Sequence, residues 1–114
     1  MVTAVAFVAM AAAGTIARAA AGRRLNRPGG LPLGTLLVNV TGAFALGLLD
    51  GVAPPAATVF GTGLLGAYTT FSTLVADTAT LARAPAGRAS AATYLTVTLT
   101  AGLLAAATGR ALAP

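Results

Sequence analysis

The sequence predicts an all-α membrane protein whose single domain, residues 1–114, contains four transmembrane helices. Hydrophobic residues make up 57% of the chain and charged residues only 8%, whereas ordinary soluble domains carry about 25% charged residues. The apolar residues form four runs, each near the ~20 residues that a helix needs to cross a bilayer. These runs are continuous rather than alternating, which favours helices because lipid requires internal hydrogen bonding of the backbone. The runs cover residues 2–21, 31–49, 55–81 and 89–107.

Turn-forming and charged residues separate these runs. The stretch GRRLNRPGG at 22–30 ends in Pro and two Gly, which break helices. Residues 50–55 combine an Asp and a Gly with two Pro, and residues 83–88 contain two Arg, a Pro and a Gly. The first run lacks the basic start of a signal peptide and its apolar stretch is long for one, so we interpret it as a transmembrane helix.

The distribution of Arg predicts the orientation of the chain. In a four-helix topology the first and third loops share one side of the membrane, and both termini share the other side with the second loop. The first side holds five Arg, whereas the second holds Arg110 and Asp50. Because cytoplasmic loops carry an excess of positive residues, we expect both termini outside the inner (cytoplasmic) membrane. The five loop residues are Arg23, Arg24, Arg27, Arg83 and Arg88.

Several classes of function are hard to build from this composition. The chain has no Cys, no His and only two carboxylates, so thiol chemistry, His-based catalysis and the usual metal sites have no residues to form them. The pattern G-x-G-x-x-G at 61–66 lacks the βαβ unit that a dinucleotide site requires. The Arg residues lie between apolar runs rather than on a soluble basic face. We therefore expect neither an enzyme nor a nucleic-acid partner.

The third apolar run combines a Gly-rich part with a cluster of hydroxyl residues. It reads GTGLLGAYTTFSTL at 61–74. This composition favours a break near the middle of the helix, which membrane proteins tolerate where the segment lines a cavity or is buried in protein. A break frees backbone carbonyls, and unwound segments of this kind hold small cations in transporters.

Uncharged donors in the second and third runs are candidates for contact with an anion. Asn39 lies mid-span, where its amide can donate to an anion or form a packing hydrogen bond between helices. Phe71 offers the positive edge of its ring, and Ser72 and Thr73 offer hydroxyls. Such weakly polarised donors can replace the water around an ion without trapping it, as conduction requires.

Arg18, Tyr94 and Thr98 are further candidates. Arg18 lies near the cytoplasmic end of the first run, where it either extends its charge to the interface or supplies positive potential to a vestibule. Tyr94 and Thr98 are four residues apart and share one helix face. The alternative for such a Thr is a hydrogen bond back to its own helix.

Three motifs together resemble one known family. They are GTIAR at 14–18, GTLLVNVTGAFALG at 34–47 and GTGLLGAYTTFSTL at 61–74, followed by Asp77. The chain resembles the fluoride channels known as Fluc or CrcB. The resemblance implies a fluoride-selective channel that exports fluoride passively across the cytoplasmic membrane and so lowers its intracellular concentration.

The resemblance also implies an assembly and a set of site residues. It implies an antiparallel, dual-topology dimer of four-helix subunits with two pores and a broken third helix at the dimer centre. A structural Na⁺ would be held there by the backbone carbonyls of Gly66 and Thr69. Arg18 matches the family's Arg of the first helix, at the vestibule. The residues that match the fluoride pore are Asn39, Phe71, Ser72, Thr73, Tyr94 and Thr98.

The chain departs from the family pattern at two positions and in its charge balance. Leu74 replaces the second Phe of the usual TTFSTF, and Asp77 replaces a Glu. A homodimer of antiparallel subunits requires nearly balanced Arg on the two sides, but here the count is five to one. We expect either a dimer with an oppositely oriented homologous subunit or a homodimer that tolerates the bias.

Two other functions fit this sequence less well than a channel. A small four-helix multidrug antiporter would need a carboxylate within the membrane to exchange protons, and the chain up to TTFST has none in its apolar runs. A scaffold that only packs helices would leave Asn39 and the TTFST cluster without a reason to lie at mid-membrane.

Overall fold

The computed structural model describes all residues, Met1–Pro114, as an all-helical chain. No strand forms; an isolated bridge joins Asn26 to Pro32 in the first loop. The first and last helices extend beyond the apolar runs, and Arg and Leu, which favour helices, are present in both extensions. In chain order the helices are α1 (Val2–Leu25), α2 (Leu33–Leu48), the π-helical η1 (Ala57–Leu65), α3 (Gly66–Tyr68), α4 (Phe71–Arg83) and α5 (Arg88–Leu112).

Helix length and composition are those of a multi-pass membrane protein. Three segments are long and apolar enough to cross a bilayer: α1, the stretch Ala57–Arg83 taken as a whole, and α5. The fourth, α2, is also apolar but has only 16 residues. At 1.5 Å per residue it is about 24 Å long, slightly less than the ~30 Å hydrocarbon core.

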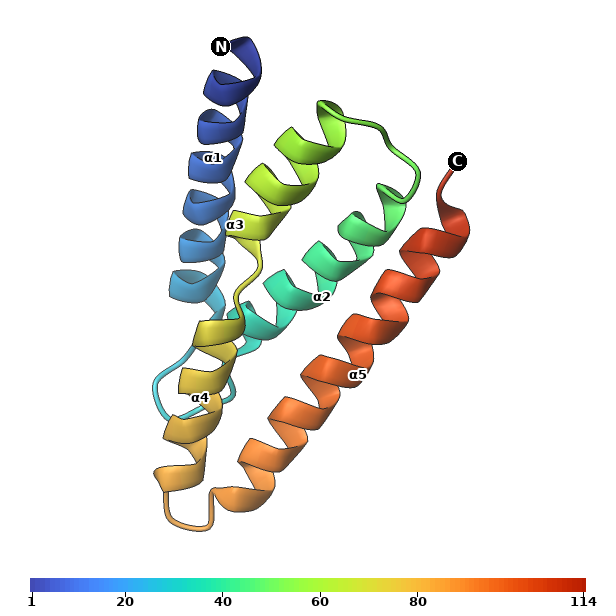
Figure 1. The fold of residues 1–114 in the computed structure, drawn as a ribbon. Coiled ribbons are helices and arrows are strands. Elements are labelled where there is room, and N and C mark those ends of the chain that lie inside the picture. Colours follow the sequence, from blue (N-terminus) through green and yellow to red (C-terminus); the bar gives the residue numbers. More distant parts are fainter.

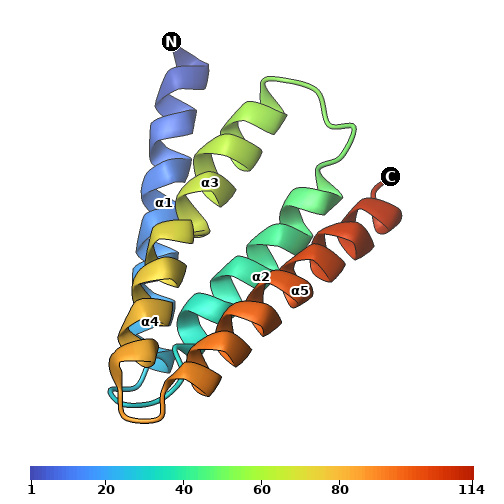
Figure 2. The same cartoon turned by 60° about the horizontal axis from the view of Figure 1, so that its bottom comes forward.

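The helices pack as two neighbouring pairs. α2 lies along α5, and α1 lies beside η1 and α3, while α4 packs against the first part of α5 (Figures 1 and 2). Both termini and the α2–η1 loop are at one end of the molecule, and the α1–α2 and α4–α5 loops are at the other (Figure 1). The five loop Arg therefore gather at one end. At the opposite end Arg110 pairs with Asp50 at 3.0 Å, the single ion pair of the chain.

Most apolar side chains point away from the interior. Only 17 of 114 residues are buried, so most apolar side chains lie on the outer surface rather than in a core. This arrangement is expected for a chain solvated by lipid or by another subunit. Large exposed side chains include Ile16, Phe71, Leu103 and Leu104, with exposed fractions of 66%, 73%, 74% and 65%.

Two glycines allow α2 and α5 to approach closely. A Cβ atom added at Gly47 would overlap the backbone carbonyl of Ala106, and one added at Gly109 would overlap that of Phe44. Small residues at such contacts let transmembrane helices pack through their backbones. The contact fixes α5 against α2 and so positions the residues that both helices present to the site.

Replacing Gly109 by Ala should destabilise the α2–α5 pair. We expect a cost of about 1–3 kcal/mol, because the added methyl group must force the helix backbones apart. The measurement is the temperature at which the purified protein loses its monodisperse peak in size-exclusion chromatography.

The matched control is Gly102→Ala on the same helix, where no atom lies within 4 Å of an added Cβ. Both changes replace Gly by a better helix former, so their difference isolates the packing contact. Equal thermal stability of the two variants would contradict the proposed role of Gly109.

Candidate functional site

Regular helical structure stops at Thr69 and Thr70. α3 ends at Tyr68, the backbones of Thr69 (φ −76, ψ 157) and Thr70 (φ −150, ψ 117) are extended, and α4 begins at Phe71. Asn39 on α2 binds this interruption from the side with two hydrogen bonds. Its Nδ2 donates to the Thr70 carbonyl at 2.9 Å, and its Oδ1 accepts from the Thr70 amide at 2.7 Å. The Asn39 side chain thus supplies both bonds that the extended residue cannot make within a helix.

This pairing changes the hydrogen bonding of two carbonyls. In a continuous helix the Thr70 amide would donate to the Gly66 carbonyl and the Thr73 amide to the Thr69 carbonyl. Instead the Thr70 amide donates to Asn39, and the Thr73 amide donates to the Thr70 hydroxyl at 3.1 Å. The Gly66 and Thr69 carbonyls therefore lose their helical donors.

Thr70 also starts α4. Its Oγ1 accepts from the Thr73 amide, the usual bond of an N-cap Thr, and donates to the Thr73 Oγ1 at 3.0 Å. Thr70 is buried, with 7% of its surface exposed. One side chain and its backbone therefore connect the start of α4 to the middle of α2.

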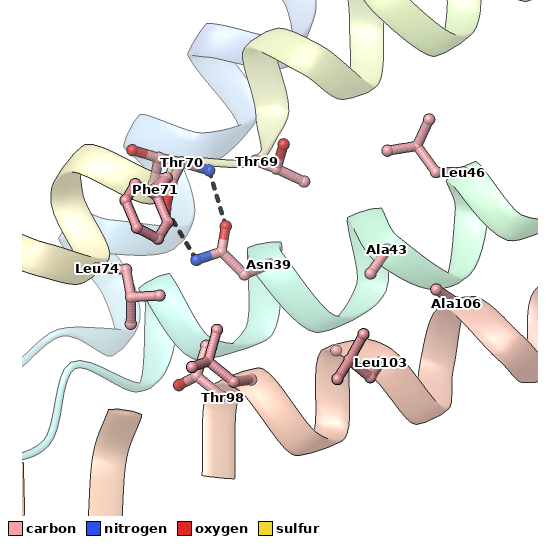
Figure 3. Close-up of a pocket in the computed structure, with 12 residues that line it drawn as sticks. Asn39, Ala43, Leu46, Thr69, Thr70, Phe71, Leu74, Thr98, Leu103 and Ala106 are labelled. Carbon is pink, nitrogen blue, oxygen red and sulfur yellow. Dashed lines mark hydrogen bonds between the residues drawn. The ribbon is translucent and has the colours of Figure 1, made fainter. Parts of the chain in front are cut away.

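A groove of about 370 Å³ lies beside the interruption (Figure 3). Its walls come from α2, from the segment 69–74 and from α5. Asn39 and Phe71 face it from the first two walls and Thr98 from the third (Figure 3). Leu74 closes one side and is only 3% exposed. The other residues of the groove are Ala43, Leu46, Thr69, Thr70, Leu99, Gly102, Leu103 and Ala106.

The groove offers hydrogen-bond donors but no charge. The Asn39 amide has two N–H groups, of which one donates to Thr70. The Thr98 Oγ1 is buried without any hydrogen-bond partner, so the bond back to its own helix that was the alternative for this residue does not form. No charged residue lines the groove, and no cluster of three metal-ligating side chains exists in the chain. An uncharged wall with free donors suits an anion better than a cation.

The structure places other candidate residues outside the groove. Arg18 and Thr73 line a separate cavity of about 220 Å³ that also contacts Thr70. Ser72 is exposed, 3.4 Å from the Thr70 hydroxyl. Tyr94 is buried at 3% exposure, and its hydroxyl donates to the Asp77 Oδ2 at 3.3 Å. The groove therefore brings together Asn39, Phe71 and Thr98 but not Tyr94.

Three residues that shape this region were not identified as site candidates from the sequence. Thr70 was noticed only as part of the hydroxyl cluster, although a Thr before an amphipathic segment is a signal for a helix N-cap. Asn26 binds the start of α2, with its Oδ1 accepting from the Gly34 amide at 2.7 Å, and no sequence signal indicates this. Asp77 was noted only as a family position, and its bond to Tyr94 depends on how α4 packs on α5.

The fold and the groove together define a class of protein. They describe a small, all-helical, multi-pass membrane protein with an interrupted helical segment beside an uncharged groove that has hydrogen-bond donors. Comparison with known proteins gives the family. Residues 5–110 match the family described as "CrcB-like protein, Camphor Resistance (CrcB)", and the chain belongs to it.

Relatives from several bacteria carry a common name. "Fluoride-specific ion channel FluC 3" of Yersinia pestis is 46% identical over 94 residues, covering 75% of this chain and 74% of the relative. "Fluoride-specific ion channel FluC 2" of Mycobacterium bovis is 47% identical over 90 residues, covering 77% and 69%. The protein of that name from Moorella thermoacetica is 53% identical over 76 residues, covering 60% and 62%.

Replacing Asn39 by Ala should destabilise the fold, because the Thr70 amide and carbonyl lose their partners. An unsatisfied buried polar group costs about 1–3 kcal/mol, and this substitution creates two. The measurement is again the thermal midpoint of the monodisperse protein.

Thr100→Ala is the control, since Thr100 is exposed on α5 and far from the interruption in sequence. A midpoint for Asn39→Ala equal to that of this control would show that the two bonds contribute nothing to stability.

Proposed function

We propose that the chain is a subunit of a fluoride-selective channel that carries fluoride passively out of the cell across the cytoplasmic membrane. Membership of the CrcB family and the names of its relatives support this function. The observation that carries it is the uncharged groove lined by Asn39, which keeps one free N–H, by Phe71 and by Thr98.

Removing water from a small anion is costly unless other donors replace it. Along the groove the Asn39 amide and the ring edge of Phe71 would provide such donors, and the Thr98 hydroxyl, which is buried in the wall, would have to turn toward the ion to join them. None carries a full charge, so the anion is solvated without being held. Arg18, in the neighbouring cavity with Thr73, raises the anion concentration at the entrance. Ser72 is proposed to act as a further donor on the route when subunits assemble, and Tyr94 could join it only by releasing its bond to Asp77.

A structural Na⁺ fits the interrupted segment of the proposed channel. The Gly66 and Thr69 carbonyls have lost their helical donors, and oxygen atoms of this kind are ligands for small hard cations. Two carbonyls leave a cation incompletely coordinated, so a second subunit would have to supply the others. When bound, the ion would add positive charge at the interruption and hold the extended backbone in place.

The proposed assembly is an antiparallel dimer in which Ala57–Arg83 forms a third crossing, broken at Thr69 and Thr70. The large exposed apolar surface around Phe71 supports a subunit contact there, because Phe71 is 73% exposed and lies beside the carbonyls that need more ligands. With Leu74 in place of the second Phe of the family pattern, one pore lacks an aromatic ring.

Charge favours a non-identical partner over a second copy of the chain. The five loop Arg gather at one end without any ion pair, while Arg110 at the other end is neutralised by Asp50. A chain with this asymmetry inserts with the Arg loops in the cytoplasm and both termini outside. An antiparallel partner must insert the other way, so we propose a homologous subunit with the opposite Arg bias.

Fluoride release from proteoliposomes tests the function. Vesicles loaded with potassium fluoride and treated with a potassium ionophore should release fluoride without any proton gradient when they contain the protein with any homologous mate that it needs. An antiporter would release it only with a proton gradient, and a scaffold would not release it. Phe71→Ile and Asn39→Asp should each slow release at least ~10-fold, which corresponds to ~1.4 kcal/mol of barrier.

Phe60→Ile is the control for the first variant, since Phe60 is partly exposed on η1 and does not line the groove. Assembly of all variants is checked by size-exclusion chromatography. Release at the unsubstituted rate in Phe71→Ile would remove the aromatic ring from the mechanism.

Orientation can be tested with single cysteines, because the chain has none of its own. In intact cells a membrane-impermeant maleimide should label Ala113→Cys and should leave Ala84→Cys in the α4–α5 loop unlabelled until the membrane is opened. Comparable labelling of both sites from outside would mean that the chain inserts in both directions and can form a homodimer.

A further inference from the structure

Asn26 lies where the end of α1 meets the start of α2. Its Oδ1 accepts from the amides of Gly34 at 2.7 Å and Thr35 at 3.3 Å, and its Nδ2 donates to the Thr35 hydroxyl at 3.2 Å. The Nδ2 group has a second N–H with no partner within the chain. Asn26 therefore joins two helices through its oxygen and keeps one donor free.

The same side chain lines two cavities. One, of about 280 Å³, opens at the Arg-rich end among Arg27, Gly29 and Asp77. The other, of about 220 Å³, is lined by Arg18 and by several hydroxyl side chains. Asn26 belongs to the walls of both, so it stands between the loop end of the molecule and the cavity that contains Arg18.

A second shared residue extends this series to the groove. Thr70 lines both the Arg18 cavity and the groove of Asn39 and Phe71. The three cavities thus follow one another from the Arg-rich end to the middle of the bundle, with Asn26 at the first junction and Thr70 at the second. Because one residue lines each pair of neighbouring cavities, the side chains of Asn26 and Thr70 are the barriers that an ion on this route would pass.

The middle cavity has the electrostatics of an anion entrance. Arg18 is partly buried and forms no ion pair, and no carboxylate lines this cavity. The outer cavity is balanced, since it contains both Arg27 and Asp77. An anion that passes Asn26 therefore leaves a region of mixed charge and enters one with a single positive charge.

We propose that Asn26 is a specificity-determining residue at the entrance of the conduction route, where its free amide N–H donates to an anion passing from the loop cavity to the Arg18 cavity. This inference rests on the proposed channel function. The neutral side chain of Asn26 matters because a carboxylate at this position would face Arg18 across a small cavity and cancel the potential that attracts the anion.

A purely structural role for Asn26 predicts a different response to substitution. Asp has the same shape as Asn and keeps an oxygen at the Oδ1 position, so Asn26→Asp keeps the acceptor for the Gly34 and Thr35 amides. If Asn26 only joined the helices, this variant would assemble and conduct normally. If it admits anions, the variant should assemble but slow fluoride release at least ~10-fold, because the added charge repels the ion.

Two further variants separate the effect of the added charge from the effect of losing the Asn26 amide. Ser90→Asp adds the same charge near the Arg-rich end, on the exposed first turn of α5, but lines none of the three cavities. Its release rate should stay within about twofold of the unsubstituted protein if only local charge matters. Asn26→Ser removes the amide without adding a charge and should conduct more than Asn26→Asp.

A chemical test covers the case in which Asn26→Asp fails to assemble. The chain has no Cys, so Asn26→Cys can be reconstituted and then treated with methanethiosulfonates of similar size and opposite charge. The anionic reagent should slow fluoride release by at least about tenfold relative to the cationic one. Equal effects of the two reagents would overturn the proposal.

The outcomes separate this inference from the proposed function. If the unsubstituted protein releases no fluoride, the channel function itself fails. If it releases fluoride and Asn26→Asp does so at the same rate, the channel stands and Asn26 is only a helix cap. Slow release by Asn26→Asp together with normal release by Ser90→Asp supports the entrance role.

Discussion

Asn39 and Thr70 are 31 residues apart in the chain, and the amide of the first completes the hydrogen bonding of the second. An extended peptide in an apolar surrounding needs partners for both its N–H and its C=O, since each unsatisfied group costs several kcal/mol in lipid. Only a side chain with a donor and an acceptor in one plane can satisfy both at once. The interruption between α3 and α4, the start of α4 at Phe71 and the wall of the groove all depend on this contact.

The same contact determines which groups remain free. Because the Thr70 amide donates to Asn39 and the Thr73 amide donates to the Thr70 hydroxyl, the carbonyls of Gly66 and Thr69 are left without helical donors. Because Asn39 uses one N–H for Thr70, its other N–H is available beside Thr98 and Phe71. One interruption therefore presents oxygen atoms on the backbone and proton donors on the side chains. Oxygen atoms suit a cation and proton donors suit an anion, so the proposed Na⁺ and fluoride sites would lie within a few residues of each other.

Charge and packing divide the molecule along its length. Five Arg lie at the loop end, Arg18 faces an inner cavity, and the groove beyond it has no charge at all. In the proposed channel this order would place attraction at the entrance and weak donors further along the route, so that an ion enters without being retained. Glycine contacts such as Gly47 with Ala106 hold α2 and α5 close enough for both helices to contribute to one groove. Few other side chains are buried, so backbone contact replaces a conventional core.

The sequence by itself determined the class of protein, the presence of apolar helices and the separation of Arg loops from the termini. Those features follow from composition and from residues close together in the chain, and hydropathy reads them directly. The proposed roles of Asn39, Phe71 and Thr98 also came from the sequence and remain predictions. The tertiary structure alone decided that Thr98 lacks a partner, that Tyr94 binds Asp77 away from the groove, and that Asn26 and Thr70 are shared between cavities. These facts depend on how α4 and α5 pack on α2. Such packing brings together residues that are far apart in the chain, and a local sequence pattern does not specify it.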